Sequence, residues 1–117
     1  MDAPQREVVV ARLLGLLGLA QRAGKLALGG TAAAQMIAGP RPALLIVARD
    51  AGQGAKKLSR LVPRERVVDG IVDRAELARA FQRDDLTVVA VEDRGFVKGI
   101  LELVAGAGAG GERPASD

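Results

Sequence analysis

The part of the sequence best suited to binding chemistry is the stretch from Gly24 to Thr31, in which one lysine and a short apolar run are followed by two glycines. Thr31 is a good helix N-cap, and the residues after it favour a helix. Backbone N–H groups and the dipole at a helix start attract phosphate or another anion, and the glycines let a bulky partner approach the backbone. The simpler alternative is a plain strand-to-helix turn, because the stretch matches neither a P-loop nor a GxGxxG fingerprint.

A second candidate for binding is the basic cluster Lys56, Lys57 and Arg60, on a segment that has the pattern of an amphipathic helix. Charge runs are often only solvated helix faces, so binding and solvation explain the cluster equally well. Its surroundings favour binding. Residues 41–66 contain seven basic and two acidic side chains, a local net charge of +5, whereas residues 67–93 contain three basic and seven acidic ones, a net charge of −4. A chain polarised in this way presents its basic region to an anionic partner.

The residue types make an enzyme a poor hypothesis. The chain has no cysteine and no histidine, so it lacks a thiolate nucleophile and the commonest general base and metal ligand. Lys25 could form a Schiff base or hold a phosphate, but the sequence shows no buried pocket around it. Three acidic pairs could act in acid–base catalysis or bind magnesium, yet each stands where a turn or a helix cap favours an acid; they are Asp69 with Asp73, Asp84 with Asp85, and Glu92 with Asp93. We therefore expect no catalytic residue and no metal ion.

Length and composition indicate one folded domain. A chain of 117 residues with 49% hydrophobic side chains can bury a substantial core. We expect the domain to occupy residues 1–105 and a disordered Gly/Ala-rich tail to occupy residues 106–117. The absence of cysteine suits the cytoplasm, and the N-terminal apolar run, interrupted by Arg12, is too short to cross a bilayer. We expect a cytoplasmic monomer with no membrane contact.

Apolar periodicity predicts that helices and strands alternate. Helical spacing favours helices over residues 6–22, 31–38, 53–62, 73–81 and 94–104. The bare apolar runs at residues 43–48 and 86–91 are typical of strands buried on both faces, and shorter strands are expected at residues 26–28 and 67–72. This alternation predicts an α/β fold, a three-layer α/β/α sandwich around a roughly four-stranded mixed sheet.

Two segments carry a family resemblance. The run from Leu14 to Leu26, which ends in Gln-Arg-Ala-Gly-Lys-Leu, and the run from Val89 to Lys98, which includes Asp-Arg-Gly-Phe-Val-Lys, are similar to the bacterial YlxQ-type proteins. Asp50 after the apolar strand and Glu76-Leu77 fit the same pattern, and the similarity extends over residues 9–104. The YlxQ-type proteins are relatives of the kink-turn-binding ribosomal proteins of the large subunit. The resemblance implies an α/β/α sandwich, no catalysis, no cofactor, and RNA recognition at the turn that contains the two glycines.

The RNA-binding relatives carry Gly-x-Asn-Glu-x-x-Lys at that turn. This chain keeps the glycine as Gly29 but has Thr31, Ala32 and Gln35 in place of Asn, Glu and Lys. We expect an RNA-binding protein associated with ribosomal or other structured, kink-turn-like RNA, with ribosomal or translation-associated proteins as further partners. The alternative is a protein-interaction adaptor that has lost RNA binding. The expected RNA-binding residues are Lys25, Gly29, Gly30, Thr31 and Gln35 at the turn, with Lys56 and Lys57 on phosphates.

Overall fold

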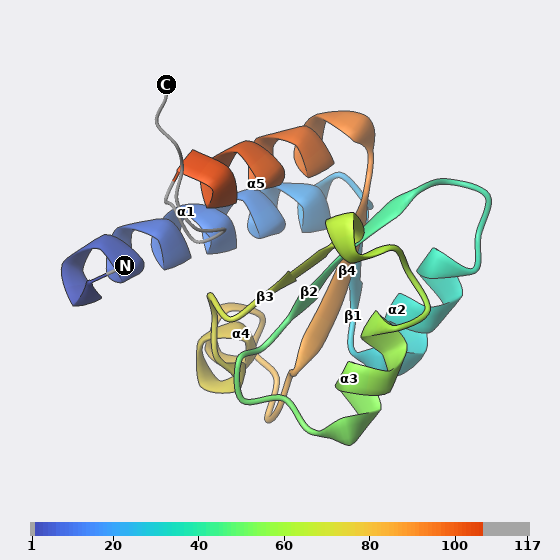
Figure 1. The fold of residues 1–117 in the computed structure, drawn as a ribbon, viewed down its shortest axis with the longest axis horizontal. Coiled ribbons are helices and arrows are strands. Elements are labelled where there is room, and N and C mark those ends of the chain that lie inside the picture. Colours follow the sequence, from blue (N-terminus) through green and yellow to red (C-terminus); the bar gives the residue numbers. More distant parts are fainter. Residues whose placement is uncertain (1, 107–117) are drawn as a thin grey trace.

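Helices and strands alternate along the chain in the computed structural model, which describes residues 2–106. The elements are α1 (Ala3–Arg22), β1 (Leu26–Leu28), α2 (Gly30–Ile37), β2 (Ala43–Val47), α3 (Gln53–Ser59), the 3-10 helix η1 (Arg64–Arg66), β3 (Val67–Asp69), α4 (Arg74–Ala80), β4 (Val88–Glu92) and α5 (Arg94–Gly106) (Figure 1). The tail expected over residues 106–117 lies outside the described residues, except for Gly106, which ends α5.

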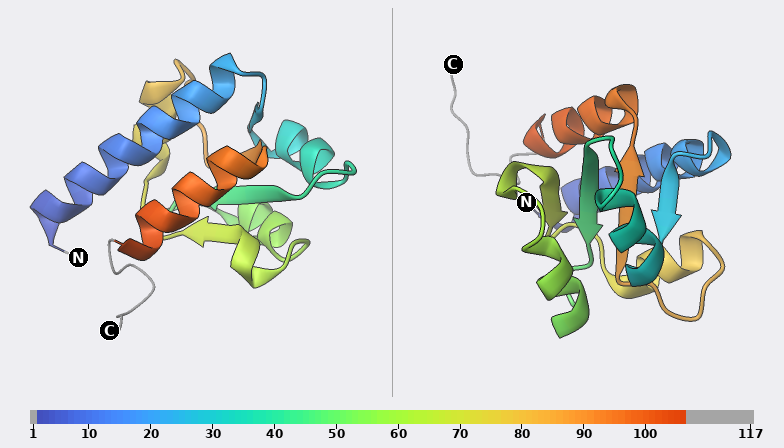
Figure 2. Two further views of the ribbon diagram at one scale, coloured as in Figure 1. Left: turned by 90° about the horizontal axis from the view of Figure 1, so that it is seen from above. Right: turned by 90° about the vertical axis from the view of Figure 1, so that its right-hand side faces the viewer.

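The four strands form one mixed sheet in the order β1-β4-β2-β3. β4 is antiparallel to both of its neighbours, and β2 and β3 are parallel. Helices α1, α4 and α5 lie on one face of the sheet, whereas α2 and α3 cover the other (Figures 1 and 2). The mixed α/β fold expected from the sequence is therefore confirmed, and this arrangement agrees with a three-layer sandwich.

The two central strands hold the core together. Every residue of β2 is buried, as are the first four residues of β4, because helices cover these strands on both faces. Ile46 in β2 and Val89 in β4 are paired in the sheet and fully inaccessible to solvent. The bare apolar runs seen in the sequence therefore predict this burial correctly.

The ends of several elements differ from the prediction for local reasons. α1 begins at Ala3 rather than Arg6, because the side chain of Asp2 accepts a hydrogen bond from the Gln5 backbone N–H (2.9 Å) and caps the helix. β3 ends at Asp69, since Gly70 has φ 77° and turns the chain out of the sheet. The strand expected from residue 86 starts at Val88. α3 ends at Ser59, although the sequence predicts a helix as far as residue 62, and Leu61 beyond its end is 73% exposed.

No helix within residues 2–106 combines the length and the apolar character that crossing a membrane requires.

Candidate functional site

The turn between β1 and α2 is built on Gly29. This glycine is the N-cap of α2 and has φ 89° and ψ 167°, a backbone conformation that essentially only glycine adopts. Its N–H donates to the Val88 carbonyl (2.9 Å), which fixes the turn against the start of β4. The expectation that Thr31 caps the helix is wrong, because the conformation of Gly29 lets the helix start two residues earlier. Thr31 lies instead in the first helical turn, with its side chain exposed.

A shallow groove of about 810 Å³ runs between α2 and α3 beside this turn. We call it the α2–α3 groove. It brings together three residues expected at the site, Gly30, Thr31 and Gln35 from α2, and faces them with Lys57 from α3. The other residues that line the groove are Ala34, Gly54, Ala55, Leu58, Leu61, Thr87 and Val88. The structure therefore joins the glycine turn and part of the basic helix in one surface.

The two lysines of α3 have different positions. Lys57 lines the α2–α3 groove, whereas Lys56 does not, because successive residues of a helix point about 100° apart. Both side chains are exposed, and neither forms an ion pair with a carboxylate of residues 2–106. Lys57 is the single charged residue among those that line the groove, so its charge is not neutralised there.

Lys25 lies at the opposite end of β1 from the turn. Its carbonyl accepts a hydrogen bond from the N–H of Glu92, the last residue of β4, whereas Gly29 is bonded to Val88, the first. The four residue-to-residue steps from Lys25 to Gly29 span about 13 Å in an extended strand. The structure thus separates Lys25 from the other residues expected at the site.

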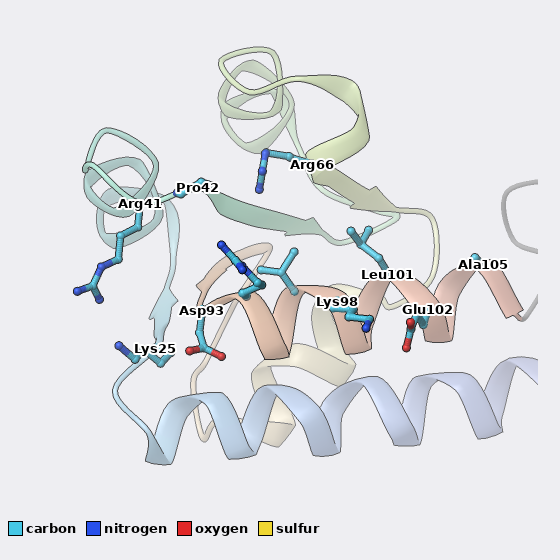
Figure 3. A pocket seen from close by; sticks show the side chains of 11 residues that line it. Lys25, Arg41, Pro42, Arg66, Asp93, Lys98, Leu101, Glu102 and Ala105 are labelled. Atoms are coloured by element: carbon cyan, nitrogen blue, oxygen red, sulfur yellow. The ribbon is translucent and has the colours of Figure 1, made fainter.

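Lys25 instead lines a pocket of about 750 Å³, which lies between α5 and the end of the sheet where strands β1 and β2 begin (Figure 3). We call it the α5 pocket. Four further cationic residues line it: Arg41, Arg66, Arg94 and Lys98. Sequence reasoning does not group them. The sequence does contain a pattern that could have grouped them, because each of three cations lies next to the end of a strand. Lys25 and Arg66 directly precede a strand, and Arg94 follows the β4–α5 turn.

Most of the acidic residues considered for catalysis have structural partners among residues 2–106. Asp73 and Glu76 form a capping box at the start of α4, Asp69 pairs with Arg64 at 3.3 Å, and Asp93 accepts hydrogen bonds from the first turn of α5. Asp85 pairs with Arg74 at 2.6 Å. No group of three or more potential metal ligands gathers within residues 2–106. Asp73 and Asp93 thus cap helices, whereas Asp69 and Asp85 form ion pairs.

The comparisons with known proteins match this chain to a solved structure. No family model and no curated protein matches the sequence. A Bacillus halodurans protein of unknown function has 31% sequence identity and a TM-score of 0.67, and the match covers 81% of this chain and 98% of the other. The two proteins belong to one family. Because the function of the Bacillus halodurans protein is unknown, this relationship supplies no activity and no ligand.

Proposed function

We propose that this protein binds structured RNA through the α2–α3 groove and the glycine turn beside it. The observation that carries the proposal is the position of Lys57 opposite Gly30, Thr31 and Gln35, which puts a cation, a hydroxyl and an amide around an open segment of backbone. Lysine binds phosphate without regard to sequence, whereas hydroxyl and amide groups can hydrogen-bond to base edges. The groove therefore offers both kinds of contact that RNA recognition uses.

The backbone at Gly30 is open to a partner. A Cβ placed on Gly30 would meet no heavy atom within 4 Å, and its φ is not in the positive range. The first N–H groups of a helix have no acceptor inside the helix and carry the positive end of its dipole. A phosphate or a base carbonyl could therefore approach the start of α2 closely.

The sequence supports the same surface. The similarity of residues 14–26 and 89–98 to YlxQ-type proteins implies RNA recognition at the turn occupied here by Gly29, Gly30 and Thr31. These residues lie on the surface of the α2–α3 groove or at its edge. Association with ribosomal or other structured RNA, and with proteins of translation, belongs to this proposal.

A second candidate function is a protein-interaction adaptor. Leu61 lines the α2–α3 groove with 73% of its surface exposed, and Ala34 and Leu58 add further apolar surface. Large exposed apolar side chains in a groove are typical of protein-binding sites. An adaptor would use the same groove with Leu61 as the main contact and would need neither Thr31 nor Gln35.

A gel shift of the purified full chain with total ribosomal RNA at two salt concentrations tests the proposal. Gly30→Leu should fold normally and weaken RNA binding, because the new side chain blocks the approach to the start of α2. The matched control is Gly15→Leu on α1, where an added Cβ also meets no heavy atom within 4 Å. RNA binding by Gly30→Leu equal to that of the control would exclude the groove as the RNA site. Absence of any shift with the unmodified chain would favour the adaptor.

A further inference from the structure

Five cationic side chains and two carboxylates line the α5 pocket. The pocket lies at the end of the strands opposite to the α2–α3 groove. Four of the cations, Lys25, Arg66, Arg94 and Lys98, form no ion pair with a carboxylate of residues 2–106. Arg41 reaches Glu92 only at 3.9 Å. The pocket therefore holds an excess of positive charge that the surrounding described chain does not neutralise.

One of the two carboxylates already has a structural role. Asp93 accepts hydrogen bonds from the N–H groups of Gly95 (3.1 Å) and Phe96 (3.3 Å) and so caps α5. It has φ 91°, which is a strained conformation for a residue other than glycine. Arg94, which lines the pocket, follows this turn as the first residue of α5. Backbone strain of this kind clusters at functional sites.

An apolar wall lies beside the cations. Val97, Leu101 and Ala105 line the pocket from α5, and Pro42 lines it from the start of β2. Leu101 remains 36% exposed although it is a large aliphatic residue. Figure 3 shows Leu101 extending upward from α5 and Arg66 entering the pocket from the opposite side. A ligand that fits here has an anionic part next to an apolar part.

We propose that the α5 pocket binds a nucleotide, with its phosphates on the cations and its base against the wall formed by Val97 and Leu101. The volume of about 750 Å³ lies within the range of about 300–1,000 Å³ typical of small-molecule sites. Guanidinium groups such as those of Arg66 and Arg94 bind phosphate through paired hydrogen bonds and stack on planar rings. The nucleotide comes either free in solution or as the 5′-phosphorylated end of an RNA strand. This site is separate from the α2–α3 groove and does not depend on the function proposed for it.

Calorimetric titration of the full chain with ATP, AMP, adenosine and tripolyphosphate tests the proposal. We expect one ATP site per chain, weaker binding of AMP, and no measurable heat with adenosine, because the phosphates supply the charged contacts. Arg66→Ala and Arg94→Gln should each weaken ATP binding by roughly tenfold, the effect of losing a hydrogen bond to a charged group. Arg79→Ala is the matched control, since Arg79 is exposed on α4 and does not line the pocket.

Competition with RNA distinguishes a free nucleotide from the 5′ end of an RNA strand as the ligand of the pocket. Displacement of ATP by a short 5′-phosphorylated RNA, but not by its 5′-hydroxyl form, assigns the pocket to RNA ends, and no displacement assigns it to free nucleotides. The proposal is overturned if ATP gives no binding heat, if Arg79→Ala weakens ATP binding as much as Arg66→Ala, or if tripolyphosphate binds as tightly as ATP. These results leave RNA binding at the α2–α3 groove unaffected, because the gel shift with Gly30→Leu measures that site separately.

Discussion

Arg6 on α1 and Glu76 on α4 are joined by two hydrogen bonds, from Nη2 to Oε1 (2.7 Å) and from Nη1 to Oε2 (3.3 Å), although 70 residues separate them. The same Glu76 carboxylate accepts the N–H of Asp73 (2.9 Å) and closes the capping box of α4. Paired hydrogen bonds between arginine and a carboxylate are among the stronger polar contacts in proteins. A single acidic side chain thus both caps α4 and attaches it to α1.

We therefore predict that Glu76→Ala lowers the free energy of unfolding by about 1–3 kcal/mol, because it removes a cap and a charged hydrogen-bond pair. Both side chains are 22% exposed, so solvent screens the pair only in part. The change also removes the hydrogen-bond partner of a guanidinium whose Nε is already buried without one within the described structure. Urea denaturation measures the effect, with Glu7→Ala on the exposed face of α1 as the control. Equal midpoints for the two variants would show that the pair contributes little.

The ion pair of Asp85 and Arg74 predicts a pH dependence. Hydrogen bonds from the Arg74 guanidinium lower the pKa of Asp85 below its ordinary value of 3.8. A lowered pKa in the folded state means that the unfolded chain binds the proton more readily. The stabilisation by Asp85 is therefore complete above about pH 3.8 and is lost as the pH falls through the lowered pKa. Thermal unfolding of the unmodified chain and Asp85→Asn should show a difference at neutral pH that shrinks in acid, and a constant difference would contradict this.

Ile46 tests the packing of the central strand. It is fully buried in β2, which lies between β4 and β3 and under helices on both faces. Ile46→Ala should lower the free energy of unfolding by about 2–5 kcal/mol, because a site packed from all sides cannot collapse around the lost methyl groups. Leu61→Ala is the matched control and should be nearly neutral, since Leu61 is 73% exposed. A small effect at Ile46 would mean that the core tolerates the cavity.

Gly29 and Gly30 should differ in how well they tolerate substitution by alanine. Gly29→Ala should cost about 1–3 kcal/mol of stability, because φ 89° is strained for any residue with a Cβ. Gly30→Ala should cost little, since its φ is ordinary and the Cβ would meet open space. Thermal unfolding of the two variants compares the same chemical change at adjacent positions. Equal losses would show that the turn relaxes around Gly29.

Salt dependence separates the kinds of RNA contact in the α2–α3 groove. Replacing Lys57, which lines the groove, by alanine should weaken binding of all RNAs alike and reduce the slope of log affinity against log salt by up to about one, because a lysine on phosphate releases about one counterion. Thr31→Val and Gln35→Ala should leave the slope unchanged and reduce discrimination between RNAs by about 1–3 kcal/mol. Filter binding with two RNAs across a salt series measures both quantities. A change of slope with Thr31→Val would contradict the assignment.

The sequence predicts the elements of this fold better than it predicts the site. Continuous apolar runs identify β2 and β4 because a strand buried on both faces has no polar positions. The start of α2 cannot be placed from the sequence, since its N-cap depends on the positive φ of Gly29, and a double glycine does not reveal which residue adopts it. Closeness in sequence groups Lys25 with the turn, but β1 lies between them.

The cluster in the α5 pocket cannot be predicted for a different reason. Its cations come from segments before β1, β2 and β3 and from the start of α5. They meet only because β4 runs antiparallel between β1 and β2. The carboxyl end of β4 therefore lies at the same end of the sheet as the first residues of β1 and β2. Strand order is decided by long-range packing, and local periodicity carries no information about it.

The position of β4 constrains how the chain can fold during its synthesis. β4 is the last strand of the described chain to be translated, yet it lies between β1 and β2 in the sheet. Until residues 88–92 leave the ribosome, β1 has no strand to pair with and one side of β2 stays open. Only β2 and β3 can pair earlier. Nascent chains stalled before residue 88 should therefore be sensitive to protease and prone to aggregation, because their unpaired strand edges remain accessible.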